Sequence, residues 1–97
     1  MPNWCMNEVR VKGAKLEEIK DALSKMCEIF DPSIDAENGV LCFDTEWDAC
    51  EDEIAELSKT FACEIELRYQ IEYEVAWRMV FKDGEAIDGG EIDFFIE

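Results

Sequence analysis

The sequence predicts an α+β domain, a two-layer sandwich in which two helices lie on one face of an antiparallel sheet. Two segments place apolar residues at helical spacing, and several others alternate apolar and polar residues as half-buried strands do. The dipeptide Asp83-Gly84 is a strong hairpin turn between the last two of these strands. With 97 residues, 48% of them hydrophobic, the chain has enough material for one core, so we expect a single domain over residues 1–97.

The N-terminal half predicts strand, helix and strand in turn. Residues 3–12 alternate as a strand, and residues 15–28 form an amphipathic helix with Lys and Glu between its apolar positions. A short strand at Ile29-Phe30 is followed by the turn-rich stretch 31–39 and a further strand over residues 40–45. The core face of the first strand is expected to carry Cys5, Asn7, Val9 and Val11.

The C-terminal half begins with a second amphipathic helix, expected over residues 47–60 with Asp44 or Thr45 as its cap. Residues 63–72 and 75–82 alternate as strands, and the tail from Glu85 predicts a last strand that Gly89-Gly90 weakens. The apolar stripe of the helix consists of Trp47, Cys50, Ile54, Leu57 and Phe61. The resulting order, β-α-β-β-α-β-β-β, fits a ferredoxin-like core with an added C-terminal hairpin.

Several motifs resemble those of one family. The opening MPNWC with Asn7, the segment FDTEW (43–47), ELRY (66–69) and WRMVFKDGE (77–85) resemble the YubB ferredoxin-like family of plasmid and phage proteins. The resemblance implies the ferredoxin-like fold and an origin in a mobile element, but it implies no catalytic residues. On this interpretation the unusual N-terminal stretch NWCMN is an edge of the core.

The sequence gives little support to an enzyme. It has no histidine to act as a base for a cysteine nucleophile, and its five cysteines form no CxxC pair. We therefore expect reduced thiols that pack in the core, and no catalytic residue, metal site or cofactor. Cys5 is the exception to follow, because a frayed N-terminus would expose its thiol. The opening lacks the pattern of a signal peptide, and no apolar run is long enough to span a membrane, so we expect a cytoplasmic protein.

Charge is the strongest functional indication. The 25 acidic and nine basic residues give a net charge of −16, and residues 28–97 hold 21 of the acids but only four of the bases. Such a chain repels nucleic acid and anionic membranes and attracts basic surfaces. We expect a non-enzymatic nucleic-acid mimic that occludes the basic groove of a host nucleic-acid-binding or defence protein, as an anti-CRISPR-type inhibitor would. The expected partner-binding residues are Asp48, Glu51, Asp52, Glu53, Glu56, Glu64 and Glu66.

Two other interpretations of the sequence stay open. The acids can serve solubility alone, because charged surfaces keep proteins dispersed. Alternatively, the protein is a structural or oligomerisation module of a mobile element, in which edge strands or the aromatics Trp4 and Phe95 mediate self-association. The mimic is expected to be a monomer or a weak dimer, whereas the module would form a dimer that salt does not dissociate.

Overall fold

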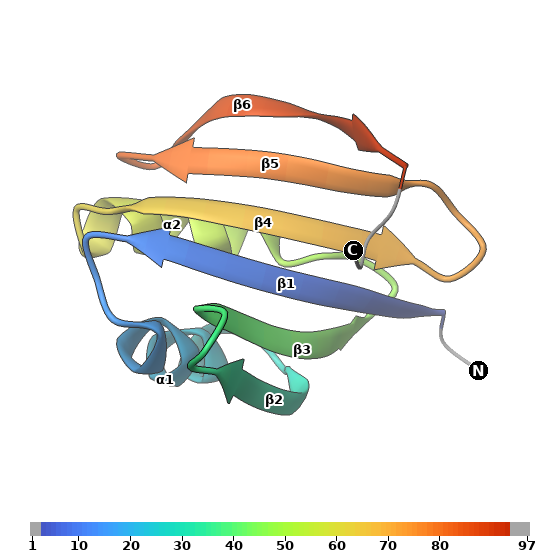
Figure 1. Ribbon diagram of the computed structural model, residues 1–97, viewed down its shortest axis with the longest axis horizontal. Coiled ribbons are helices and arrows are strands. Elements are labelled where there is room, and N and C mark those ends of the chain that lie inside the picture. The colour runs from blue at the N-terminus through green and yellow to red at the C-terminus, as the bar shows by residue number, and fades with distance from the viewer. Residues whose placement is uncertain (1–2, 94–97) are drawn as a thin grey trace.

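The protein is built from one antiparallel sheet and two helices (Figure 1). The computed structural model describes residues 3–93. Along the chain the elements are β1 (Trp4–Lys12), α1 (Leu16–Met26), β2 (Phe30–Asp35), β3 (Val40–Glu46), α2 (Glu51–Thr60), β4 (Glu64–Ile71), β5 (Ala76–Lys82) and β6 (Glu85–Ile92). The strands lie in the order β2-β3-β1-β4-β5-β6, with every neighbouring pair antiparallel. This arrangement confirms the predicted ferredoxin-like α+β fold.

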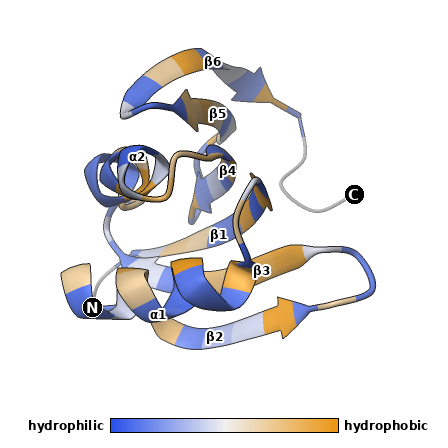
Figure 2. Ribbon diagram, turned by 90° about the vertical axis from the view of Figure 1, so that its left-hand side faces the viewer, coloured by the Kyte–Doolittle hydropathy of each residue, from blue (hydrophilic) through white to orange (hydrophobic). Residues whose placement is uncertain are grey.

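The core lies between the helices and one face of the sheet (Figures 1 and 2). Because residues two apart on a strand share a face, alternate side chains of each central strand reach this core. The helices contribute apolar residues at the spacing that the sequence predicted for them. The fully buried side chains of this cluster are Val9, Ile19, Leu23, Leu41, Ile54, Ile65 and Leu67. The other face of the sheet, called here the open face, carries the polar residues of β1 and β4.

The N-terminal stretch NWCMN is part of the core rather than a frayed end. Cys5 is completely buried and Asn7 is 2% exposed, so the thiol at position 5 does not reach solvent. The Asn7 side chain donates hydrogen bonds through Nδ2 to the carbonyl oxygens of Cys5 and Phe43 and to Oγ1 of Thr45. A buried amide remains stable in the core because it finds such partners. Asn7 therefore connects β1 to β3 through the interior.

The stretch 31–39, expected to be a turn, is half strand. β2 extends to Asp35 at the edge of the sheet, where its pairing with β3 is irregular between Phe30 and Ser33. An edge strand tolerates Pro32 because one side of it has no neighbouring strand that needs the missing N–H. The turn itself follows Asp35, whose side chain accepts hydrogen bonds from the backbone N–H groups of Glu37 and Asn38.

The second helix begins later than predicted. α2 starts at Glu51 with Cys50 as its N-cap, and neither Asp44 nor Thr45 caps it. Trp47 has a left-handed backbone with φ of 69° and is 55% exposed, so it does not belong to the apolar stripe of the helix. Its backbone N–H donates instead to the carbonyl of Asn3, which ties the end of β3 to the start of β1. The sequence spacing of Trp47 fitted a helical stripe by coincidence.

β6 pairs with β5 along the far edge of the sheet (Figure 1). It passes through Gly89 and Gly90 without ending there. In the register of the pair Gly89 lies opposite Met79, and a Cβ at this glycine would be 2.7 Å from the Met79 sulfur. The glycine thus leaves the space that the methionine occupies. The remainder of the predicted tail strand, including Phe95, lies outside the described residues.

Candidate partner-binding surface

Five of the seven predicted site residues lie together at the start of α2. They are called here the α2 acidic surface and comprise Asp48, Glu51, Asp52, Glu53 and Glu56. Three of them occupy the first turn of the helix, where negative charge interacts favourably with the positive end of the helix dipole. Within the described residues, no ion pair neutralises any of the five. Their charge is therefore not offset by an ion pair within this part of the chain.

The segment that leads into α2 is held by the buried Asn7. Thr45 accepts a hydrogen bond from Asn7 and donates one from its Oγ1 to the carbonyl oxygen of Asp48, at 2.6 Å. The backbone N–H of Asp48 in turn donates to the carbonyl oxygen of Glu46. These bonds fix the chain between β3 and α2 in one conformation. The position of Asp48 on the surface thus depends on a polar contact in the core.

The other two predicted residues, Glu64 and Glu66, lie on the opposite side of the sheet. Ile65 and Leu67 on the same strand point into the core under the helices, so the glutamates between them point to the open face. The structure does not bring them together with the α2 acidic surface. One surface cannot use all seven residues as a single contact.

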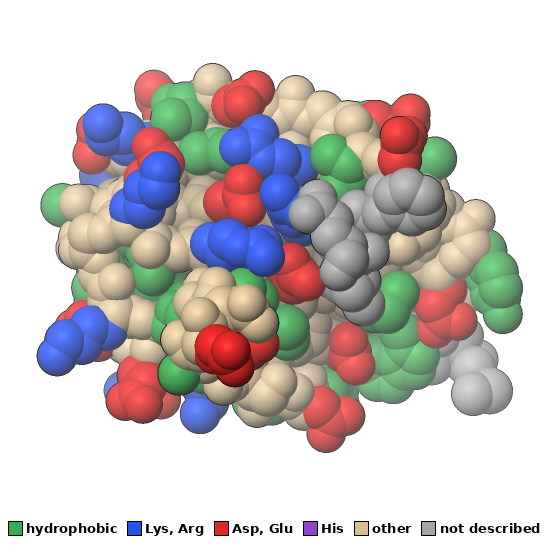
Figure 3. Space-filling model, viewed as in Figure 1, with side chains coloured by type: hydrophobic (Ala, Val, Ile, Leu, Met, Phe, Trp, Pro, Cys, Tyr) green, Lys and Arg blue, Asp and Glu red, His purple; other side chains and the backbone are tan. Residues whose placement is uncertain are grey.

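The open face is electrically balanced rather than acidic. Glu66 lies within 4 Å of three guanidinium groups, at 2.7 Å from Nε of Arg78, 3.4 Å from Nε of Arg68 and 3.7 Å from Nη1 of Arg10. Arg10 also pairs with Glu8 at 2.9 Å. Figure 3, which views this face, shows basic and acidic side chains interleaved over its centre. The negative potential of the protein therefore arises mainly elsewhere.

Sequence reasoning missed this balance because strand register is not visible in one strand. On β4 alone Arg68 is the single base among glutamates, so this strand by itself predicts an acidic open face. Pairing places Arg10 of β1 opposite Glu66, Lys12 opposite Glu64, and Arg78 of β5 opposite Arg68. The alternation within β1 and β5 indicates that these bases lie on the open face, but it does not show which strands are neighbours. Both pieces of information are needed to predict the balance of charge.

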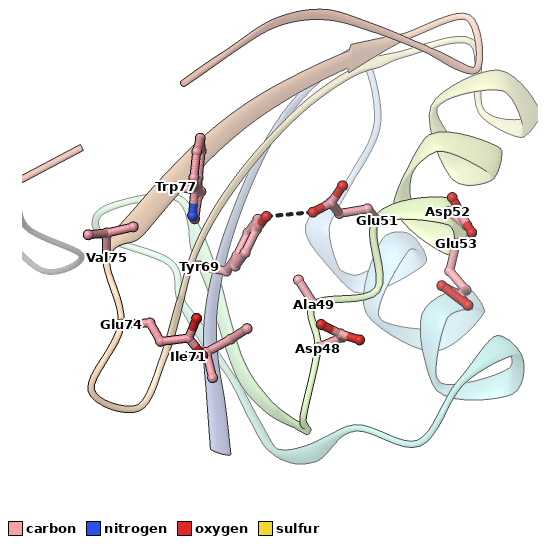
Figure 4. A pocket seen from close by; sticks show the side chains of 10 residues that line it. All are labelled: Asp48, Ala49, Glu51, Asp52, Glu53, Tyr69, Ile71, Glu74, Val75 and Trp77. Carbon is pink, nitrogen blue, oxygen red and sulfur yellow. Dashed lines mark hydrogen bonds between the residues drawn. The ribbon is translucent and has the colours of Figure 1, made fainter. Parts of the chain in front are cut away.

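A hollow of about 300 Å³ adjoins the α2 acidic surface (Figure 4). Tyr69 of β4 and Trp77 of β5 stand next to each other on the sheet, and Glu51 faces Tyr69 from the start of the helix. The Tyr69 hydroxyl donates a hydrogen bond to Oε1 of Glu51 at 2.6 Å. Glu74, in the loop between β4 and β5, lies on the far side. Acids and aromatic rings thus line one concavity, which contains no Lys or Arg among the described residues.

The chemistry of this hollow suits a positively charged group. Burial, with the Glu51 hydrogen bond as a further cause, raises the pKa of Tyr69 above its ordinary value of 10.0, so the phenol stays protonated and donates to the carboxylate. Trp77 is 38% exposed and offers a ring face on which a cation can rest. Carboxylates and an aromatic ring around one concavity attract Lys or Arg side chains and repel anions.

A second hollow of about 250 Å³ lies on the other side of the start of α2. Asp48 and Glu53 line both hollows, and the second also contains Glu28 and Glu46. Its wall includes Cys27 and Cys50, and burial raises the pKa of both thiols above the ordinary 9.0. A thiol that resists ionisation is a poor nucleophile, so these cysteines suit packing better than catalysis.

Three residues that line the hollow beside α2 are not among the predicted site residues: Tyr69, Trp77 and Glu74. Tyr69 and Trp77 both occupy alternating positions that predict core, and only their place at the end of the covered part of the sheet leaves them accessible. The signal that could have found them is their pairing across β4 and β5. Without the register, an aromatic residue on an apolar face is indistinguishable from a core residue.

Comparison with known proteins places the fold in a family. A family model described as the ferredoxin-like domain in Api92-like proteins matches residues 24–95, which are 72 of the 97 residues. The match includes α2, whose residues line both hollows, and the strands β4 to β6. The opening NWCMN precedes the matched residues. No curated protein and no solved structure matches the chain. Within residues 3–93, neither helix has the length and apolar character needed to cross a membrane.

Proposed function

The chain belongs to the family of ferredoxin-like domains found in Api92-like proteins, and we propose that it is a non-enzymatic binding protein that uses the α2 acidic surface to occlude a basic groove. The partner is a nucleic-acid-binding protein or complex, such as a host nuclease or a CRISPR effector. The protein takes the place of the phosphate backbone and does not bind nucleic acid itself. It acts in the cytoplasm of the host cell.

One observation carries this proposal: within residues 3–93 the acids of α2 form no ion pair, whereas the acids at the centre of the open face do. Glu66 and Asp88 are held by Arg78, and their charges are already offset. A basic partner approaching the open face would have to break these pairs, whereas the α2 acidic surface offers its charge at no such cost. The proposal therefore assigns the contact to α2 and leaves Glu64 and Glu66 outside it.

Charge of this kind acts first on the rate of association. Unpaired carboxylates attract a basic groove over about 8–10 Å at physiological ionic strength and steer the two proteins together. The first turn of α2 holds its acids on a rigid scaffold, which spares part of the ordering entropy that a flexible acidic tail loses on binding. Affinity should consequently fall steeply as salt concentration rises.

The proposal extends to the architecture and origin of the protein. A two-layer sandwich with β5 and β6 as a hairpin added to the ferredoxin-like core is the arrangement that the pairing of β5 with β6 favours. We place the protein in a plasmid or phage because a mobile element gains from disabling a host defence. The motifs in the opening residues and in FDTEW support that origin.

The test compares three versions of the chain as immobilised bait in a bacterial lysate, eluted along a salt gradient. The α2-neutral variant carries Asp48→Asn, Asp52→Asn, Glu53→Gln and Glu56→Gln, and it keeps Glu51 because Tyr69 bonds to it. A control with the same net charge alters four exposed acids elsewhere: Glu17→Gln, Asp21→Asn, Glu37→Gln and Glu85→Gln. We expect nucleic-acid-binding proteins to elute from the wild type and the control at raised salt, and to be absent from the α2-neutral variant. Equal retention by all three would contradict the proposed surface.

The alternative, an oligomerisation module, is favoured by the exposed edge of the sheet at β6. This strand has eight residues and no proline, whereas β2 at the other edge contains Pro32 and a register shift. Of the aromatics predicted to mediate self-association, Trp4 instead packs its ring against Phe30 at 5.1 Å between centroids. Sedimentation at low and high salt separates the two functions, because pairing of edge strands produces a dimer that salt does not dissociate.

A further inference from the structure

The helices leave part of the apolar sheet face uncovered beyond α2. α2 packs on β4 and β5, whereas β6 packs mainly on β5. Along β5 the side chains on the helix face become more accessible toward its start: Phe81 is 4% exposed under the helix, and Trp77 is 38% exposed. Ile87 of β6 is 55% exposed. The β5–β6 end of the sheet therefore has an apolar face with no element of the described chain packed over it.

This apolar face forms a further hollow, distinct from the two described above, beside the acidic hollow that Glu51 and Tyr69 line. A shallow hollow of about 570 Å³ is lined by Trp77, Met79, Ala86, Ile87, Asp88, Gly89 and Gly90. Gly89 and Gly90 carry no side chains to fill it, and Met79 lies beneath Gly89. Trp77 also lines the hollow beside α2, so it belongs to both. Because they share Trp77, the hollow beside α2 and this one are treated as one groove, called here the Trp77 groove. Its end at α2 is acidic, and the side chains at its end at β6 are apolar except for Asp88.

We propose that the Trp77 groove takes a basic amphipathic segment of the partner protein, with an Arg or Lys side chain in the hollow beside α2 and an apolar side chain over Met79 and Ile87. The inference rests on the proposed function, because it names the segment through which the partner of the α2 acidic surface is recognised. Charge complementarity selects this occupant. At the α2 end the groove presents Asp48, Glu51 and Glu74, and no Lys or Arg of residues 3–93 lines it.

The groove explains how an acidic protein can discriminate among basic partners. An acidic surface that acts through charge alone is attracted to any cationic surface, so it discriminates little between basic partners. A tryptophan between an acidic hollow and an apolar hollow requires a cation and an apolar group at a set spacing, and such aromatic anchors account for much of the energy of many interfaces. The cation would rest on the Trp77 ring and approach the Glu51 carboxylate.

Synthetic peptides of 14 residues test the proposal directly. One places Arg and Leu at helical spacing, so that the two residue types occupy opposite faces of a helix. A second keeps the arginines and replaces each Leu by Ser, and a third replaces each Arg by Glu. Binding is measured by anisotropy of the labelled peptide and by the indole N–H resonance of Trp77 in ¹H–¹⁵N spectra. We expect the Arg–Leu peptide to bind and to shift that resonance. The Arg–Ser peptide should bind with an affinity lower by about tenfold or more, and the Glu–Leu peptide should not bind.

Two variants and one control locate the contact. Trp77→Ala and Ile87→Ser should each weaken binding of the Arg–Leu peptide. Trp77→Ala should lower the affinity by about tenfold or more. Trp47→Ala should not, because Trp47 is more open to solvent than Trp77 but lines neither hollow of the groove. Ile87→Ser keeps the test valid if Trp77→Ala fails to fold.

Each contrary outcome has a distinct meaning. Equal binding of the Arg–Leu and Arg–Ser peptides, insensitive to Trp77, overturns the groove but leaves charge-driven binding by α2 intact. A dimer whose interface covers Trp77 and excludes the peptide also overturns it, because the occupant is then a second copy. Binding that needs Trp77 but is unchanged in the α2-neutral variant contradicts the proposed function instead. Failure of every peptide to bind overturns the groove, while the lysate test still decides the proposed function.

Discussion

Arg78 and Glu66 face each other across β5 and β4, with Nε of the guanidinium donating to Oε2 of the carboxylate at 2.7 Å. The same guanidinium donates through Nη1 to Asp88 at 2.9 Å, so it joins three strands. The hydrogen bonds of Arg78 to these two carboxylates raise its pKa and hold its charge in place. This contact offsets the charges of Glu66 and Asp88 on the open face, whereas no ion pair within residues 3–93 offsets the acids of α2.

Glu66→Gln should lower stability without weakening the binding of a basic partner. The glutamate side chain is 20% exposed and lies among three arginines, whose mutual repulsion increases once its charge is removed. We expect a loss of about 1 kcal/mol in the free energy of unfolding, measured in urea. Glu64→Gln is the control, since its partner Lys12 is 86% exposed and 3.8 Å away, and its effect should be smaller. A Glu66→Gln protein that folds normally but no longer binds the partner would return this residue to the site.

Glu56→Gln should stabilise the isolated protein at low salt. Glu56 lies four residues after Asp52 and three after Glu53 on α2, spacings at which like charges repel by about 0.2–0.5 kcal/mol per pair. Unlike the acids of the first turn, it gains little from the helix dipole. Lys59, three residues after it, forms no ion pair with it within 4 Å and offsets only part of the repulsion from the two acids, so removal of the charge is a net gain. The gain should disappear in about 1 M salt, where screening is nearly complete. Destabilisation by Glu56→Gln would mean that the glutamate has a cationic partner after all.

Asn7→Leu should destabilise the fold by about 2 kcal/mol, although it replaces a polar core residue by an apolar one of similar size. The substitution removes the donor for the carbonyl oxygens of Cys5 and Phe43 and for Thr45 Oγ1, all of them in the interior. The denaturant midpoint should fall with little change in the slope of the transition. Thr45→Val, which removes the bond to Asp48, should cost less stability but weaken partner binding. An unchanged midpoint in Asn7→Leu would show that the amide contributes no net stability.

Stability should decrease at alkaline pH because buried thiols resist ionisation. Burial raises the pKa of Cys5 from 9.0 to about 11, so between these values the unfolded chain releases a proton that the folded chain retains. The unfolded state then binds fewer protons, and the free energy of unfolding falls as pH rises, by at most about 1.4 kcal/mol per pH unit for this group. Below pH 9 the thiol is neutral in both states and has no such effect. Urea titrations at pH 8, 9, 10 and 11 should show a shallower decline for Cys5→Ala than for the wild type, and identical declines would contradict the assignment.

Local patterns were sufficient to predict most of the fold. Alternation in β1 and β4 and helical spacing in α1 identified elements that the structure contains within a few residues. The errors occurred where tertiary structure overrides local preference. Pro32 and the acids around it suggest a turn, but an edge strand accommodates them, and Trp47 continues a helical spacing although its φ of 69° places it before the helix.

The candidate site could be predicted only in part. The acids of α2 lie within nine residues of each other, so their grouping follows from the sequence alone. Whether Glu66 joins them depends on which face of β4 lies under the helices and on which strands flank it. The Trp77 groove depends in addition on where α2 stops covering the sheet, a property of packing that no local pattern specifies.

The most direct test of the central claim is displacement of nucleic acid from the captured partner. The partner is purified with labelled DNA or RNA in its groove, and release of the label is measured as the wild type, the α2-neutral variant or the charge-matched control is added. Our account predicts competitive release by the wild type and the control, a dependence on salt, and no release by the α2-neutral variant. Formation of a ternary complex in which the partner holds both the protein and its nucleic acid would contradict mimicry.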